Sequence, residues 1–300
     1  MLVKQRGYSL VVDAPAKLNL SLDVLGKRSD GYHELETLMV RVGLYDTLRV
    51  SPLETDRIDF LCRRSAGSRA QNRDAVPLGD DNLVVRAARL LREETGCSQG
   101  ARIELFKRIP SESGLGGASS DAAAALLALN RLWKLELSLE QLQRIGGTLG
   151  SDVPFFLFQT VAALCRGRGE VVEPVPLSQT LHFVIARPQS GLSTADVYRE
   201  CEPSAVAKGT GPRIDALNDG RLQQVAQRFH NALQAPAERL NPEVSRTLSQ
   251  LARHRLLGPT MSGSGTACFG ISISRRQALT VAARLRAAGN DRVYAVESRP

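Results

Sequence analysis

The chain has 300 residues, of which 43% are hydrophobic, and can bury the core of one large or two medium domains. No apolar run approaches the roughly 20 residues that span a bilayer, and no apolar signal segment follows residues 1–6, so we expect a cytoplasmic protein without a membrane anchor. The net charge of +8 favours anionic ligands, while an aromatic content of only 5% argues against binding of single-stranded nucleic acid by base stacking.

The five cysteines are scattered along the chain and form no C-x-x-C pair. An odd, dispersed set is typical of reduced thiols and predicts neither a disulfide framework nor a zinc site.

The N-terminal part of the chain predicts a series of β-strands. Apolar residues alternate with polar ones over residues 8–14 and 18–24, and residues 14–17 (APAK) are expected to interrupt the strand. Residues 63–81 are polar, carry glycine and proline and show no periodicity, which indicates an exposed excursion. Three further strands are expected in this part, at residues 38–42, 47–51 and 58–62.

Helices and strands mix in the rest of the chain. Apolar residues at helical spacing predict a helix over residues 82–95, with Asp80 or Asp81 as its N-terminal cap and Gly96 as its stop. Ser138 and Gln141 fit the capping box of another helix. Further strands are expected at residues 101–106, 181–186 and 267–273, and further helices at residues 221–229, 243–254 and 275–288.

The elements show no strict alternation of strand and helix, which predicts the α+β class. Around residues 173–176 the spacing of apolar residues no longer indicates a strand or a helix. We place a domain boundary there, between an N-terminal domain of residues 1–172 and a C-terminal domain of residues 173–300.

The most informative stretch is residues 109–121, where glycines and serines lead from an expected strand into an alanine-rich helix. Glycine permits close backbone approach, and the first turn of a helix presents free N–H groups and a positive dipole end. Together these features predict an anion site, most naturally one for phosphate.

Two common phosphate loops can be tested against this stretch. A Walker A loop needs a lysine that reaches the β- and γ-phosphates, and no lysine lies between Lys107 and Lys134. A dinucleotide fingerprint needs a third glycine where this chain has Ser119. The loop is therefore a lysine-free phosphate cradle.

Several segments resemble signature segments of a known family, the GHMP small-molecule kinases. The three that resemble the whole family are residues 15–20 (PAKLNL), 110–121 (PSESGLGGASSD) and 261–265 (MSGSG). Three more resemble the branch that phosphorylates the 2-hydroxyl of 4-diphosphocytidyl-2-C-methyl-D-erythritol: residues 30–35 (DGYHEL), 149–154 (LGSDVP) and 231–233 (NAL). All six occur in the expected order nearly from end to end, which makes the resemblance specific.

The resemblance implies a two-domain GHMP kinase fold. The N-terminal, ATP-binding domain would be like ribosomal protein S5 domain 2, the C-terminal domain would be ferredoxin-like, and the active site would lie between them. The implied reaction transfers the γ-phosphoryl group of ATP, with Mg²⁺ neutralising phosphate charge, in the non-mevalonate route to isopentenyl diphosphate. A monomer or weak homodimer is expected, with a small-molecule substrate and without nucleic acid or membrane partners.

Two residues match the catalytic positions of the family. The resemblance makes Asp152 the general base, and it makes Lys17 the cation that orients or polarises the acceptor hydroxyl and pairs with that aspartate. Without the resemblance, an aspartate after Gly-Ser is more typical of a helix cap or a turn.

The resemblance also assigns the ATP site. Ser113 and Ala118 depart from the residues commoner in the family, which leaves open which donors reach which phosphate. Asn82 and Lys107 match positions near the adenine but equally fit a helix start and a solvated strand end. No protein ligand of Mg²⁺ is assigned. The loop residues expected at the triphosphate are Pro110, Ser113, Gly114, Leu115, Gly116, Gly117, Ala118, Ser119 and Ser120.

The acceptor site is assigned in the same way. Tyr32 and His33 match the cytosine pocket, with Tyr198 as the second aromatic wall, and a base between two rings gains about 1–3 kcal/mol. The other expected acceptor-site residues are Asn19 and Thr194, which line the erythritol and diphosphate pocket, and Gly263 and Ser264, which close the site.

Two other functions remain open. Another GHMP kinase, acting on mevalonate, homoserine or a sugar, would have no use for the cytidyl pocket at residues 30–35. An S5-like domain that binds RNA would explain the positive charge but neither Lys17 with Asp152 nor the glycine-rich loop.

Overall fold

The computed structural model describes residues 1–64, 76–204, 211–290 and 292–299. Contacts group these residues into two compact units. The first unit comprises residues 1–16, 44–111 and 116–159, and the second comprises residues 17–43, 112–115 and 160–300. These units are defined by contacts and combine separate stretches of the chain. They do not test the domain boundary at residues 172–173, which stays a prediction.

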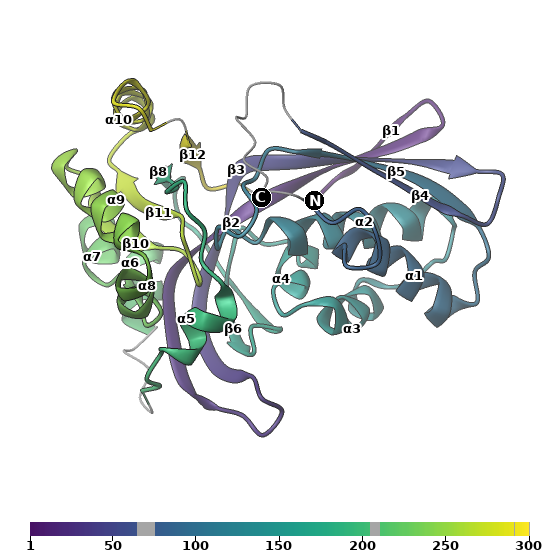
Figure 1. The fold of residues 1–300 in the computed structure, drawn as a ribbon, viewed down its shortest axis with the longest axis horizontal. Coiled ribbons are helices and arrows are strands. Elements are labelled where there is room, and N and C mark those ends of the chain that lie inside the picture. The colour runs from purple at the N-terminus through teal and green to yellow at the C-terminus, as the bar shows by residue number, and fades with distance from the viewer. Residues whose placement is uncertain (65–75, 205–210, 291, 300) are drawn as a thin grey trace. The chain divides into compact units, whose positions relative to one another are not determined.

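The first unit is a sheet covered by helices. Strand β1 (Val3–Arg6) pairs antiparallel with β2 (Ser9–Lys27). Strand β3 (His33–Leu53) pairs antiparallel with β5 (Gly100–Lys107), which pairs parallel with β4 (Ile58–Arg64). Helices α1 (Leu83–Thr95), α2 (Gly117–Leu132), α3 (Leu139–Leu149) and α4 (Val153–Leu157) contact one another and lie together along one side of this sheet (Figure 1).

Alternation along β5 explains which face the helices cover. Ala101, Ile103 and Leu105 are buried, while Arg102 between them is exposed. The facing helix α2 is lined with alanines, whose small side chains let helix and sheet backbones approach closely. The buried alanines of α2 are Ala122, Ala123, Ala124, Ala125 and Ala128.

The second unit contains a four-stranded antiparallel sheet in the order β10 (Leu257–Met261), β11 (Cys268–Ser272), β8 (His182–Ala186), β12 (Val293–Glu297). Three other pairings belong to this unit: β3 with β6 (Ala162–Gly167), β6 with β7 (Val171–Val175), and β2 with β9 (His230–Asn231). Its helices are α5 (Thr194–Arg199), α6 (Gly211–Asn218), α7 (Leu222–Gln227), α8 (Gln234–Leu240), α9 (Pro242–Arg253) and α10 (Arg275–Ala287).

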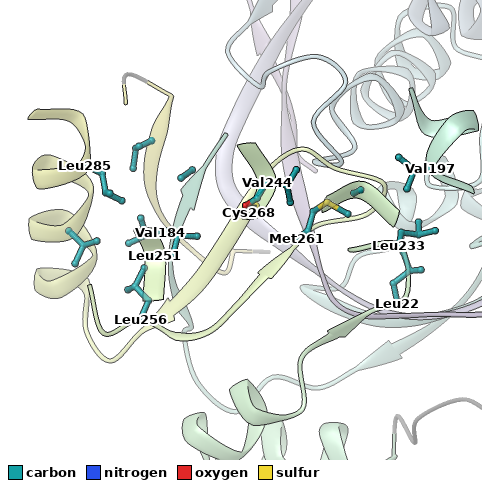
Figure 2. Packing of buried hydrophobic residues seen from close by; sticks show 14 of the residues in the cluster. Leu22, Val184, Val197, Leu233, Val244, Leu251, Leu256, Met261, Cys268 and Leu285 are labelled. Atoms are coloured by element: carbon teal, nitrogen blue, oxygen red, sulfur yellow. Dashed lines mark hydrogen bonds between the residues drawn. The ribbon is translucent and has the colours of Figure 1, made fainter. Parts of the chain in front are cut away.

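One apolar cluster forms the core of the second unit. Val184 and Cys268 from the sheet pack with Leu251 of α9 and Leu285 of α10, and Met261 continues the cluster toward the end of β10 (Figure 2). Every one of these side chains is almost completely buried. The third signature segment, residues 261–265, therefore begins at a residue that is packed in this core.

The predicted α+β class is confirmed, and most elements lie where they were expected. The capping box at Ser138 is present, and Gly96 ends α1 in the left-handed conformation with φ 66°. Among the described residues, no helix combines the length and apolarity needed to cross a bilayer.

Three expectations about local structure are wrong. Asn82 caps α1, rather than Asp80 or Asp81, because its side chain accepts from Val84 N at 2.8 Å. Pro15 does not interrupt β2, since proline fixes φ near a value that extended backbone accepts and lacks only the N–H donor. The expected strands 38–42 and 47–51 are likewise parts of one long strand, β3. Most of the expected excursion, residues 65–75, lies outside the described residues.

Candidate active site

The glycine-rich loop lies between β5 and α2, where the sequence predicts it. Gly116 is the N-cap of α2, with φ 69°, and no side chain caps the helix. No serine of the loop caps α2, so the first-turn N–H groups of this helix receive no side-chain cap. Such a terminus is suited to bind an anion.

The serines and glycines of the loop differ in their surroundings. Oγ of Ser120 is buried and forms no hydrogen bond within the described residues. In the second unit, Ser113 O accepts from Ala267 N at 3.0 Å, and Gly114 has φ 74°. A Cβ on Gly114 would lie 2.0 Å from Ser262 O, so only glycine fits there.

The two residues expected near the adenine both have structural partners. Asn82 caps α1, and its Nδ2 donates to Pro77 O at 2.7 Å. Lys107 is buried, and its Nζ donates to Asp46 Oδ2 at 2.5 Å and Asp121 Oδ2 at 2.7 Å. Their adenine roles remain predictions, while the helix-start reading of Asn82 is correct and the solvated reading of Lys107 is wrong.

Asp152 occupies the N-cap position of α4 in the first unit, but its side chain forms no capping hydrogen bond. Its carboxylate is therefore not used for the structural role that a helix-capping aspartate would have. Lys17 belongs to the second unit, where it is 4% exposed and donates to Asn19 Oδ1 at 2.6 Å. The pairing of Lys17 with Asp152 remains a prediction.

Asn19 is the centre of a hydrogen-bond network in the second unit. Besides accepting from Lys17, its Nδ2 donates to Thr37 Oγ1 at 2.8 Å, and its backbone N donates to Ser262 Oγ at 3.2 Å. Ser262 Oγ in turn lies 3.0 Å from Gly114 O, to which it donates. Residues from all three family-wide signature segments thus meet around one amide.

Sequence reasoning did not single out two members of this network. Ser262 lies within the third signature segment, next to Gly263, and this position could have identified it as a site residue. Thr37 lies in the middle of a strand, and nothing in its sequence context distinguishes it from an ordinary strand threonine.

The aromatic residues of the expected cytosine pocket lie in the second unit. The rings of His33 and Tyr198 stack with centroids 5.0 Å apart and an interplanar angle of 26°. Tyr32 is 53% exposed, and the guanidinium of Arg168 lies 4.8 Å from its ring centroid. Burial, with a smaller contribution from Lys27, lowers the pKa of His33, so its imidazole is neutral at pH 7.

The loop of residues 261–265 is held by an amide. Nδ2 of Asn231 donates to Met261 O and to Gly263 O, both at 2.8 Å. Oγ1 of Thr194 lies 2.9 Å from Ser264 Oγ, so these two expected acceptor-site residues are in contact.

Among the described residues, no group of three or more His, Cys, Asp and Glu side chains could hold a metal ion. Mg²⁺ commonly keeps several waters and binds through substrate phosphates instead of a dedicated protein cage.

Comparisons with known proteins agree with this geometry. The model of the GHMP kinases N terminal domain matches residues 82–160, and that of the GHMP kinases C terminal matches residues 214–291. The chain is 40% identical over 258 residues, 85% of each chain, to the 4-diphosphocytidyl-2-C-methyl-D-erythritol kinase of Alkaliphilus metalliredigens (strain QYMF). It is 40% identical over 263 residues to the enzyme of the same name from Bacillus cereus (strain B4264), covering 87% of this chain and 88% of that one.

Solved structures of kinases are also similar to this chain. A crystal structure of 4-(cytidine 5'-diphospho)-2C-methyl-D-erythritol kinase superposes with a TM-score of 0.80 at 37% identity, covering 97% of this chain and 100% of the other. A homoserine kinase from Cytophaga hutchinsonii superposes with a TM-score of 0.74 at 19% identity, covering 100% and 97%. The second likeness concerns the fold alone.

Proposed function

The chain belongs to the GHMP kinase family and, within it, to the 4-diphosphocytidyl-2-C-methyl-D-erythritol kinases, and on this premise we propose that it phosphorylates the 2-hydroxyl of 4-diphosphocytidyl-2-C-methyl-D-erythritol with ATP. This reaction supplies isopentenyl diphosphate by the non-mevalonate route. The observation that carries the proposal is the aromatic group Tyr32, His33 and Tyr198, which a kinase acting on mevalonate or homoserine would not need.

Phosphoryl transfer requires positioning, charge neutralisation and removal of the hydroxyl proton. Asp152 serves as the general base. Its place at the N-cap position of α4, directly after the turn at Gly150 and Ser151, supports this role together with the family resemblance. Lys17 polarises the acceptor hydroxyl, and its hydrogen bond to Asn19 fixes the direction of its ammonium group.

The triphosphate binds to the loop through backbone N–H groups at the start of α2, with Ser119 or Ser120 adding a hydroxyl. The uncapped terminus at Gly116 and the unpartnered Oγ of Ser120 support this assignment. Mg²⁺ accompanies ATP and neutralises its charge. The adenine lies near Asn82 and Lys107, and the buried ammonium group of Lys107 also has the role argued below.

The cytosine stacks on Tyr32 and Tyr198, and His33 reads its edge with a neutral imidazole. Asn19 and Thr194 line the erythritol and diphosphate part of the pocket. Gly263 and Ser264 close it, supported by the contact between Ser264 and Thr194.

We propose that the protein acts in the cytoplasm as a monomer or weak homodimer, without nucleic acid. A titration against RNA at increasing salt would test the last point, because phosphate-dependent binding weakens steeply with salt.

A coupled assay of ADP release tests the proposed reaction. With ATP and Mg²⁺, we expect turnover with the cytidyl substrate and background rates with mevalonate or homoserine. Turnover of mevalonate or homoserine in preference to the cytidyl substrate would overturn the assignment.

A further inference from the structure

A buried triad of charged residues lies at both ends of the phosphate loop. Nζ of Lys107, the last residue of β5, bridges Asp46 on β3 and Asp121 on α2. Their side chains are 7%, 0% and 3% exposed, respectively. The triad lies entirely in the first unit.

Asp46 holds the start of the loop. Its Oδ1 accepts from the backbone N of Arg108 at 2.5 Å and of Ile109 at 2.8 Å, while its Oδ2 accepts from Lys107. Asp46 thus accepts three hydrogen bonds, two from the backbone and one from Lys107.

Asp121 holds the end of the loop, in the second turn of α2, but its environment differs. Its Oδ2 accepts from Lys107, whereas its Oδ1 is buried and forms no hydrogen bond within the described residues. With both carboxylates ionised, the triad would carry one uncompensated negative charge. Burying such a charge is costly, so the proton that removes it belongs on Asp121, the less satisfied of the two.

We propose that Asp46, Lys107 and Asp121 position the two ends of the phosphate loop, and that the loop binds the triphosphate of a nucleotide best when Asp121 is protonated. A triphosphate at the start of α2 brings several negative charges to the same helix. An ionised Asp121 opposes them through the poorly screened interior, and a neutral one does not.

The pKa values of the triad agree with this assignment. Burial, and secondarily the charge of Asp46, raises the pKa of Asp121 to about 7 against the opposing effect of Lys107. Burial alone would lower the pKa of Lys107, but the charges of Asp121 and Asp46 outweigh it and raise that pKa, so Lys107 stays charged.

No other described group around Asp121 titrates near neutral pH. The thiol of Cys62 on β4 interacts with the charges of the triad and of Arg64. Burial raises the pKa of this thiol, so it stays neutral. Helices α1, α3 and α4 pack against α2 with apolar buried residues. Examples are Val84, Ala87 and Leu91 of α1, Leu142 and Ile145 of α3, and Phe155 and Phe156 of α4.

The triad also explains why residue 117 is a glycine. A Cβ at this position would lie 2.9 Å from Nζ of Lys107, so the first residue of α2 must be small for the ammonium to reach Asp121. Lys107 is thus a positioning residue, which acts on the nucleotide through the loop.

The inference rests on the proposed ATP site, so its test measures nucleotide binding without the acceptor. Affinity for a non-hydrolysable ATP analogue with an imido bridge is measured by calorimetry between pH 6 and 8.5. The protein is compared with Asp121→Asn, which keeps the oxygen that accepts from Lys107, and with Asp59→Asn, which removes a half-buried acid of the same unit that pairs with Arg102 outside the triad. We expect the dissociation constant of the wild type, divided by that of Asp121→Asn, to rise about tenfold over this range. A tenfold change corresponds to a shift of one unit in the pKa of Asp121 when the nucleotide binds. Asp59→Asn should follow the wild type.

A second pair of variants tests the charge balance. Lys107→Gln leaves two buried carboxylates uncompensated and should weaken nucleotide binding more at pH 8 than at pH 6, and adding Asp121→Asn should restore part of the affinity. The same pH dependence in wild type and Asp121→Asn would overturn the inference. Absence of nucleotide binding by the wild type at every pH would instead contradict the proposed function.

If a variant fails to fold, carboxyl ¹³C NMR of the wild type decides the question. One aspartate should titrate near pH 7, and its pKa should rise when the analogue is added. An Asp121 that stays ionised at pH 6 with the analogue bound would overturn the inference.

Discussion

The rings of His33 and Tyr198 stack on each other at 5.0 Å in the second unit. A planar base between two rings requires two van der Waals separations of about 3.5 Å each, or about 7 Å in all. A base therefore cannot lie between these two rings without separating them. The cytosine therefore has to stack on the face of Tyr198 that does not contact His33, or on the shared face after the two rings have separated.

The exposed face of Tyr32 gives the first prediction. Tyr32→Ala should raise KM for the cytidyl substrate about 5- to 150-fold, the equivalent of 1–3 kcal/mol of base stacking. KM for ATP should be unchanged, since the phosphate loop does not depend on this ring. Steady-state kinetics with each substrate varied in turn measure both. Equal effects on the two KM values would place Tyr32 outside the cytosine pocket.

Tyr198 gives a matched comparison. Tyr198→Phe keeps the ring and should leave KM for the cytidyl substrate within about twofold, while Tyr198→Ala should raise it as far as Tyr32→Ala does. A large effect of Tyr198→Phe would show that the hydroxyl, rather than the ring, is what the substrate uses.

The second prediction concerns Asp152. Asp152→Asn should lower kcat about 10²- to 10⁴-fold, the usual contribution of a general base. This loss of kcat should appear in protein that is still folded, since the substitution removes no capping bond of α4. Single-turnover kinetics test the loss of rate, and a thermal melt tests whether the variant is folded. Near-normal kcat in the folded variant would remove Asp152 from the reaction.

Lys17 requires a different design, because its ammonium is buried against Asn19 Oδ1. Lys17→Ala should abolish turnover, and Lys17→Met, which keeps most of the side-chain volume, should do the same with a smaller loss of stability. Activity in Lys17→Met would indicate that only packing at this position matters.

The sequence predicted local motifs well and tertiary partners poorly. The loop at 109–121, the capping box at Ser138 and the end of α1 at Gly96 depend on residues close in sequence, so their patterns could be read directly. The partners of Lys107 come from β3 and α2, and no local pattern identifies such an ion pair. The sequence therefore allows a solvated strand end at Lys107, which the burial of its side chain contradicts, and an adenine contact, which stays a prediction.

The third prediction concerns Gly114, whose backbone is left-handed and whose missing Cβ makes room for Ser262 O. Gly114→Ala should lower the melting temperature by several degrees more than Gly289→Ala. Gly289 also has positive φ, at 92°, but nothing lies within 4 Å of an added Cβ, so its substitution costs only the conformational penalty of about 1–2 kcal/mol. Equal melting temperatures for the two variants would mean that the close approach to Ser262 does not constrain residue 114.

The fourth prediction concerns Asn231, which is 5% exposed and donates twice to the backbone of residues 261–263. Asn231→Asp preserves its shape and its bond from Leu233 N at 2.9 Å, but replaces both donors with a carboxylate oxygen facing two carbonyl oxygens. A buried, unpaired charge costs more than a missing hydrogen bond, so we expect a loss of about 3 kcal/mol or more. Asn231→Ala, which removes the donors without adding charge, should cost less.

Both Asn231 variants should also weaken acceptor binding, because the carbonyls of Met261 and Gly263 lose the group that holds the loop carrying Ser264. Chemical denaturation gives the free energy of unfolding, and steady-state kinetics give KM for the cytidyl substrate. Lowering the pH should restore part of the stability of Asn231→Asp, since protonation removes the charge and returns a donor, but should not help Asn231→Ala. An Asp variant as stable as the wild type at pH 8 would contradict the role assigned to the two amide hydrogens.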